Sequence, residues 1–103
     1  MNDLETYAQF LKALAHPIRL RIIEILKGDR ICVKNIGELM DIQQANLSQH
    51  LSVLRHCGIV STYREGNRVC YSIKDPRAIQ ILNSLEGTET LRLEAQGSAS
   101  GDR

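Results

Sequence analysis

The stretch QQANLSQHLSVLRHCGIV, residues 43–60, decides the fold. Leu47, Leu51 and Leu54 fall at i, i+4 and i+7, which places them on one narrow apolar stripe of a helix. The side chains that point away from this stripe are small or polar, and none is a carboxylate: Ala45, Ser48, Gln49, Ser52 and His56. A solvated helix face usually carries Glu and Lys pairs, whereas amides and hydroxyls read base edges in DNA. The pattern therefore predicts a DNA-recognition helix, which Gly58 ends because glycine adopts the left-handed conformation at low cost.

A second, shorter helix is expected just before this one. The segment VKNIGELM, residues 33–40, places Val33, Ile36, Leu39 and Met40 on an inward face. Asp41 and Ile42 then leave room for a tight turn only. Two helices separated by so few residues are typical of a helix-turn-helix motif.

A β-hairpin is expected after the recognition helix. Residues 59–63 and 69–73 are rich in β-branched and aromatic side chains, and Gly66-Asn67 lies between them. A two-residue Gly-Asn loop between such runs favours a hairpin. Arg64 and Arg68 fall at its tip, where guanidinium groups can reach the DNA backbone or the minor groove.

The rest of the chain supplies helices that cover this motif. Helical periodicity is expected up to about residue 15, over residues 18–27 after Pro17, and again after Asp75-Pro76, with a short strand over residues 30–32. The predicted fold is mainly α with a small β-hairpin, a winged helix-turn-helix in the order α-α-β-α-α-β-β-α. Because the last pattern fades by Gly87, residues 1–87 are expected to form this domain and residues 88–103 a disordered tail.

Composition limits the classes of function. A chain of 103 residues with 43% hydrophobic side chains suits one small domain that gains from dimerisation. No apolar run approaches ~20 residues, and the acidic start lacks a signal-peptide pattern, so a cytoplasmic protein without a membrane partner is expected. Three cysteines fit a reducing compartment better than a disulfide framework. No paired carboxylates, nucleophile–base pair or phosphate-binding glycine loop indicates an enzyme.

The net charge of +1 hides an uneven distribution. Residues 86–103 carry a net charge of −2, which leaves +3 on the remainder. The segment from Ala45 to Lys74 contains one acidic residue, Glu65, and four basic residues: Arg55, Arg64, Arg68 and Lys74. The local field around the predicted motif therefore favours phosphate.

Three segments in one order resemble the ArsR/SmtB family of bacterial winged-helix repressors: LKALAHPIRLRIIEIL (residues 11–26), LSQHLSVLRHCGIV (residues 47–60) and YREGNRVCYSI (residues 63–73). The resemblance implies a homodimer that is joined mainly by its first and last helices and binds an imperfect palindromic operator in double-stranded DNA. It also implies release by an inducer, which in the family is a metal or metalloid ion, an oxidant or a reactive sulfur species. By this analogy the dimer interface comprises Tyr7, Phe10, Leu11, Leu14, Ile79, Leu82 and Leu85. The alternative is that these side chains only close the core of one subunit.

The predicted DNA contacts lie on the recognition helix and the hairpin tip: Gln44, Ala45, Asn46, Ser48, Gln49, Ser52, His56, Arg64 and Arg68. Gln and Asn can bond adenine through two hydrogen bonds, and the Ala45 methyl suits a thymine methyl. His56 is expected at a phosphate, whereas His50 is expected to pack or to bond a neighbouring backbone group. The alternatives are a solvated helix face and an ordinary charged hairpin tip.

The cysteines are the candidate sensor, without a confident metal site. Where the family's arsenic and heavy-metal motif reads CVC, this chain reads Cys32-Val33-Lys34, and the Asp, His and Glu ligands of the family's last-helix zinc site are absent. Cys32 precedes a helix N-terminus, which stabilises a thiolate. Winged-helix sheets usually pair the strands of Cys32 and Cys70, so the two are expected to lie close. Cys57, at the end of the recognition helix, is the third candidate.

Several hypotheses remain open at this point. The preferred one is a sequence-specific, DNA-binding repressor released by thiol chemistry or by a metal or metalloid ion bound at a nonstandard cysteine site. The cysteines alternatively only pack, since free cysteines are among the most buried residues. One rival is a winged-helix module that binds another protein, and the other is a DNA-binding repressor that senses no ligand.

Overall fold

The computed structural model describes the backbone of residues 3–98 and the side chains of residues 3–87. In chain order its elements are α1 (Asp3–Leu14), α2 (Pro17–Leu26), β1 (Ile31–Cys32), α3 (Val33–Met40), α4 (Gln44–His56), β2 (Val60–Glu65), β3 (Arg68–Ile73) and α5 (Arg77–Ser98). This is the predicted order of a winged helix-turn-helix, and α3 has the predicted bounds. None of the described helices is both long and apolar enough to span a bilayer.

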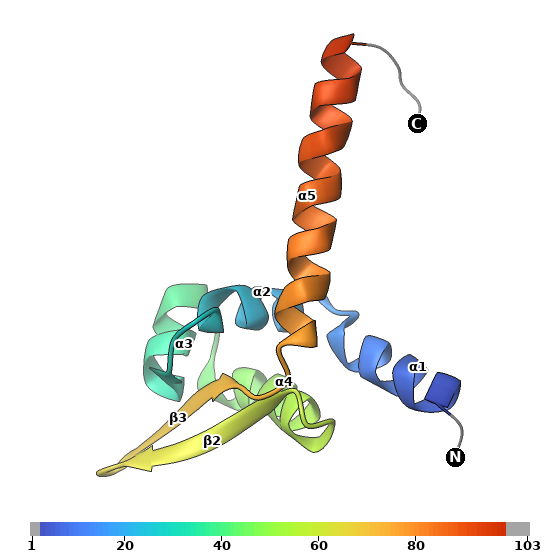
Figure 1. The fold of residues 1–103 in the computed structure, drawn as a ribbon. Coiled ribbons are helices and arrows are strands. Elements are labelled where there is room, and N and C mark those ends of the chain that lie inside the picture. Colours follow the sequence, from blue (N-terminus) through green and yellow to red (C-terminus); the bar gives the residue numbers. More distant parts are fainter. Residues whose placement is uncertain (1–2, 99–103) are drawn as a thin grey trace.

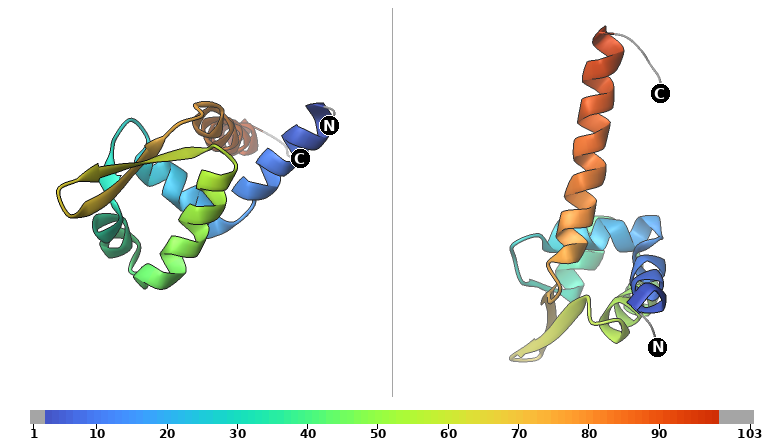
Figure 2. Two further views of the ribbon diagram at one scale, coloured as in Figure 1. Left: turned by 90° about the horizontal axis from the view of Figure 1, so that it is seen from below. Right: turned by 45° about the vertical axis from the view of Figure 1, so that its right-hand side comes forward.

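The elements are arranged so that α4 and the hairpin lie at one end of the molecule. Figure 1 shows α4 and the β2–β3 hairpin at the bottom, with α5 rising away from them in the opposite direction. The sheet is antiparallel with the strand order β1-β3-β2, so β3 lies between the first short strand and the rest of the wing. Seen from below, α4 and the hairpin diverge from each other across this end (Figure 2).

The core forms around the leucine stripe that the sequence indicated. Leu47, Leu51 and Leu54 are fully buried, and they pack with the buried face of α2, which includes Ile22 and Ile23. Burial of each such side chain stabilises the fold by about 1.5–3 kcal/mol. The stripe therefore fixes which face of α4 is left for solvent.

Two backbone features set the turn between α3 and α4. Asp41 adopts a left-handed conformation with φ 55°, and its N–H donates to the last turn of α3, which ends that helix. The N–H of Ile42 donates a hydrogen bond of 3.2 Å to the carbonyl oxygen of Gly37, which holds the turn against the end of α3. After α4, Gly58 is left-handed with φ 72°, as its sequence position predicted.

The structure corrects one expectation and extends the last helix beyond its apolar pattern. Leu39 was expected to face inward, but it is 60% exposed. Helix α5 continues past Gly87 to Ser98, although the apolar pattern fades at residue 87. The end of an apolar pattern shows where burial in the subunit ends, but it does not show where a helix ends. The Leu, Glu and Ala residues that follow Gly87 have high helix propensity, which favours continuation of α5. The division into a domain over residues 1–87 and a tail stays a prediction, and residues 99–103 lie outside the described ones.

Candidate nucleic-acid interface and the neighbouring thiol pair

The front of α4 is turned to solvent. The side chains of Gln44, Ala45, Asn46, Ser48 and Gln49 are exposed, and Leu47 between them is buried. Gln43 caps the helix with its backbone only, since its side chain makes no capping hydrogen bond. The amide and hydroxyl groups of this front, called the recognition face below, are thus available to a partner outside the subunit.

The back of α4 divides between solvent and the subunit. Ser52 is half-buried, and His56 is exposed with its Nδ1 3.3 Å from the carbonyl oxygen of Ser52. The exposure and terminal position of His56 suit a phosphate contact better than a base contact. Ser52 offers less accessible surface than the residues at the front of the helix.

The two arginines of the wing leave it on opposite faces. In the register between β2 and β3, Arg64 lies opposite Val69 and Arg68 lies opposite Glu65. Residues opposite each other in a sheet share a face, whereas neighbours along a strand, such as Arg64 and Glu65, lie on different faces. Both arginines are exposed, and neither forms an ion pair with a carboxylate of residues 3–87. Their guanidinium groups are therefore available for phosphate, but they reach it from different sides of the hairpin.

His50 belongs to a polar cluster that joins α4 to α2. Its Nδ1 accepts a hydrogen bond of 3.2 Å from Nε of Arg19, and its ring lies 4.4 Å from that of His16. Burial, and then the charges of His16 and Arg19, lower the pKa of His50 below its ordinary value. The prediction that His50 packs away from DNA agrees with this position, although its partner is a side chain and not the expected backbone group. Arg19 was missed because no local pattern links residues 31 positions apart.

The candidate dimer residues fall into two groups. Leu14 and Leu82 are buried within the subunit, and Phe10 and Ile79 pack against the same core. The others leave a large part of their apolar surface to solvent: Tyr7 47%, Leu11 51% and Leu85 55%. This second group presents most of the apolar surface that a partner subunit can cover, and Phe10 and Ile79 are partly exposed as well.

Cys32 and Cys70 are joined by a disulfide in the structure. They face each other directly across the β1–β3 ladder, and their Cα atoms are 3.6 Å apart, well inside the ~7 Å limit for a bridge. Both are buried, with exposed fractions of 8% and 1%. The predicted proximity of this pair is confirmed, and the two form a bridge although the odd number of cysteines did not indicate a disulfide framework. Cys57 is free and exposed, next to Phe10 and Arg77.

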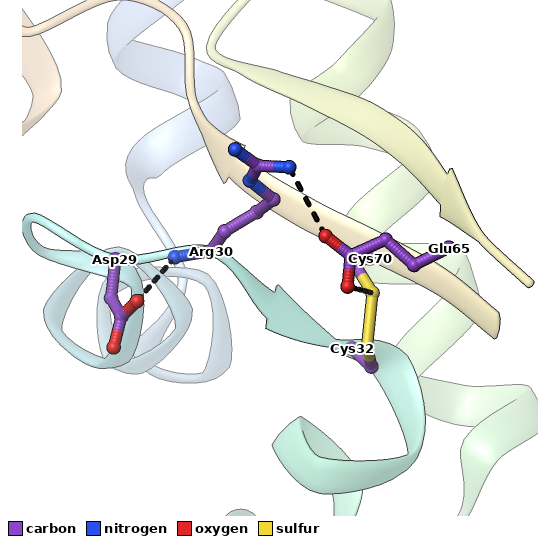
Figure 3. The surroundings of a disulfide bond; sticks show 5 residues. All are labelled: Asp29, Arg30, Cys32, Glu65 and Cys70. Atoms are coloured by element: carbon purple, nitrogen blue, oxygen red, sulfur yellow. Dashed lines mark hydrogen bonds and ion pairs between the residues drawn. A yellow bond between two sulfur atoms is a disulfide. The ribbon is translucent and has the colours of Figure 1, made fainter.

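A carboxylate that the sequence analysis left unassigned lies beside this bridge. Oε1 of Glu65 is 3.9 Å from Sγ of Cys70, and its Oε2 accepts a hydrogen bond of 3.1 Å from Arg30 (Figure 3). The two-residue loop fixes the register, which places Tyr63 opposite Cys70 and Glu65 two residues along on the same face. The hairpin pattern was thus enough to place Glu65 near a thiol, but not to place Arg30.

Known proteins are similar to this chain in sequence and in architecture. The profile of the family described as "Bacterial regulatory protein, arsR family" matches residues 16–62. The HTH-type transcriptional regulator Rv0081 of Mycobacterium tuberculosis is 44% identical over 80 residues, 73% of this chain and 67% of that protein. A probable mercury resistance operon repressor of Streptomyces lividans is 42% identical over 82 residues, 76% of this chain and 62% of the repressor.

Solved structures agree with the sequence matches. The crystal structure of Rv0081 has a TM-score of 0.75 at 34% identity, covering 96% of this chain and all of that one. The transcriptional repressor BigR of Xylella fastidiosa has a TM-score of 0.77 at 34% identity, covering 82% and 87% of the two chains.

The fold and the exposed recognition face thus define a winged helix-turn-helix transcriptional regulator. The chain belongs to the arsR family of bacterial regulatory proteins. The matched family is one of transcriptional regulators.

Proposed function

We propose that the protein is a cytoplasmic repressor that binds a palindromic operator as a homodimer and is released from it by thiol chemistry. In each subunit α4 enters a major groove, where the recognition face contacts base edges, and the wing arginines bind the sugar-phosphate backbone. The observation that carries this proposal is the exposed, carboxylate-free front of α4, at the same end of the molecule as the wing (Figure 1).

The exposed apolar residues of the outer helices support a dimer. Tyr7 and Leu11 of α1 and Leu85 of α5 are each about half exposed or more. A small core gains stability when a second copy covers such surface. Repression is supported by relatives, since BigR and the Streptomyces lividans protein are both named repressors.

The disulfide supplies a route from a chemical inducer to the DNA-binding surface. Cys32 is the N-cap residue of α3, and Cys70 lies in β3 of the wing, so the bridge ties the helix-turn-helix to the wing. A hydroperoxide forms the bridge by taking two electrons and two protons from the thiols, and it is itself reduced to an alcohol and water. In this proposal the reduced protein holds the operator and the bridged protein leaves it. A coupling of about 1–3 kcal/mol is enough for such release.

DNA binding is tested by titrating the reduced protein with an operator duplex selected from random sequence, at about 50 and 200 mM salt. Arg64 and Arg68 provide four guanidinium groups per dimer, so log K falls against log salt with a slope of about −3.6 if each meets a phosphate. Affinity then drops about 150-fold over this fourfold change in salt. Absence of duplex binding at the lower salt concentration would support the rival hypothesis of a protein-binding module.

Release is tested on the same duplex with hydroperoxide-treated protein. Wild-type protein loses operator affinity on oxidation and regains it with a dithiol reductant, whereas Cys32→Ser and Cys70→Ser do not respond. Cys57→Ser is the matched control, since its thiol lies outside the bridge. If oxidation changed the operator affinity of wild type and of all three serine variants equally, the protein would be a repressor that does not sense oxidants through this bridge.

A further inference from the structure

We propose that the reduced protein binds a thiophilic divalent cation, of the class of Zn²⁺ and Cd²⁺, through Sγ of Cys32, Sγ of Cys70 and a carboxylate oxygen of Glu65. The inference deepens the thiol-based regulation proposed above and rests on the same pair of cysteines. Binding of the ion itself, however, does not require that the protein recognise DNA.

The three ligand atoms already lie together. The two Sγ atoms and the Glu65 oxygen are all within 4.8 Å of one another. Figure 3 shows the carboxylate directed at the sulfur of Cys70, with Cys32 on the adjoining strand. Because Cys32 pairs with Cys70 and Glu65 is two residues from the partner of Cys70 in β2, the sheet register holds all three on one face. The cluster therefore follows from the backbone and not from one side-chain rotamer.

The spacing suits tetrahedral coordination once the thiols are reduced. Thiolate–zinc bonds of about 2.3 Å place two coordinating sulfur atoms about 3.8 Å apart, and a carboxylate oxygen slightly closer. Oε1 of Glu65 is already 3.9 Å from Sγ of Cys70. The two sulfur atoms are bonded in the bridged protein, and after reduction small rotations of the two cysteine side chains bring them to the separation of a coordinated pair. Two thiolates and one carboxylate leave the fourth position to water, an arrangement that zinc accepts at sites with three protein ligands.

Arg30 orients the carboxylate and balances the charge. Its guanidinium group donates to Oε2 of Glu65 and lies 4.6 Å from the ring centroid of Tyr63, which leaves Oε1 directed at Cys70. Partners that hold a ligand in this way commonly alter metal affinity by about 10–100-fold. Two thiolates and the carboxylate carry three negative charges, and Arg30 with a divalent cation carries three positive charges, so the occupied cluster is neutral.

The cluster is reachable and discriminates among ions. A cleft on the surface is lined by Cys32, Glu38, Leu39, Glu65 and Arg68, and it gives an ion access to two of the three ligand residues, Cys32 and Glu65. Soft thiolates select thiophilic cations over Mg²⁺ and Ca²⁺, which prefer oxygen ligands. Trivalent arsenic, which takes up to three thiolates, finds only two in this cluster.

The ion and the disulfide exclude each other. A dithiol reductant opens the bridge by giving two electrons and two protons to the sulfur atoms, and it becomes a disulfide itself. The cation then displaces the two thiol protons. A thiolate bound to the cation no longer attacks a peroxide readily, so the loaded protein resists oxidation. The reduced pair of sulfur atoms thus binds the cation, and the same pair is oxidised to the disulfide when no cation is bound.

The test uses the full chain carrying Cys57→Ser, reduced and without DNA. Titration with Cd²⁺ is followed by the ultraviolet thiolate-to-metal charge-transfer band and by equilibrium dialysis. We expect one Cd²⁺ per chain. Glu65→Gln weakens its binding at least about tenfold, whereas Glu38→Gln, in the same cleft but outside the cluster, leaves the affinity unchanged. Cys32→Ser and Cys70→Ser each lose about half of the band. Bound Cd²⁺ also slows oxidation of the pair by hydroperoxide.

Three results would overturn the inference: no saturable band in the reduced protein, equal affinity in Glu65→Gln and its control, or equal oxidation with and without Cd²⁺. Because Glu65 is exposed, the glutamine variant remains a valid test even if a serine variant fails to fold. Cd²⁺ binding without duplex binding would support this site and contradict the proposed function. Duplex binding without Cd²⁺ binding would do the reverse.

Discussion

Reduction of the Cys32–Cys70 bridge is expected to lower the free energy of unfolding substantially. The bridge closes a loop with a sequence separation of 38 residues. In the chain-entropy treatment, a cross-link of this length removes about 4 kcal/mol of conformational freedom from the unfolded chain at 25 °C. This is a large share of the roughly 5–15 kcal/mol by which small domains are stable. The oxidation state is therefore expected to affect stability in addition to the DNA affinity proposed above.

The measurement is urea unfolding of oxidised and reduced protein at one fixed protein concentration, because dimerisation also shifts the midpoint. With an m value of about 1–3 kcal/mol/M, a loss of 4 kcal/mol moves the midpoint down by at least about 1.3 M. Cys70→Ser should unfold near the reduced midpoint whether or not a reductant is present. Cys57→Ser should show the full difference, because Cys57 is not bridged.

Coincident midpoints for oxidised and reduced wild-type protein would refute this reasoning. So would a shift of equal size in Cys70→Ser, since that variant cannot form the bridge. Either result would mean that the Cys32–Cys70 bridge does not stabilise the attachment of the wing to α3.

Three further predictions concern the dimer, the wing and the half-buried His50. Leu11→Glu should yield monomers in sedimentation, whereas Leu39→Glu, at a similarly exposed position on α3, should not; a dimeric Leu11→Glu protein would exclude α1 from the interface. Arg68→Gln should halve the salt slope of operator binding to about −1.8 and weaken all duplexes alike, and an unaltered slope would mean that the side chain meets no phosphate. His50 has a lowered pKa because of burial and the nearby His16 and Arg19 charges, so its contribution to stability is complete above about pH 6.5 and is lost as pH falls below that value. Urea midpoints at about pH 7.5 and 5.5 should therefore differ less in His50→Gln than in wild type or in His56→Gln, and an equal difference in all three would contradict this assignment.

The sequence predicted those parts of the fold that depend on local pattern. The leucine stripe of α4 gave its buried face, and Gly58 gave its end, because both follow from helical geometry and backbone conformation. The pairing of Cys32 with Cys70 followed from the usual strand order of a winged sheet. Pattern alone failed at Leu39, whose helical position indicated burial although no neighbouring element covers it.

Contacts between distant segments could not be predicted in the same way. Arg19 with His50 and Arg30 with Glu65 join residues 31 and 35 positions apart, and long side chains reach such partners only after the elements have packed. The same holds for the candidate dimer residues, since helical periodicity placed Leu14 and Leu11 on one apolar stripe. The packing of α1 then buried Leu14 and left Leu11 half exposed.

Base-specific contact by the recognition face is tested most directly with Gln49→Ala, measured on the selected operator and on a scrambled duplex of the same length. Two hydrogen bonds from the Gln49 amide to one adenine predict a loss of about 1–3 kcal/mol on the operator and almost none on the scrambled duplex. Equal affinities of variant and wild type on the operator, or an equal loss on both duplexes, would contradict the assignment of α4 as the helix that reads DNA.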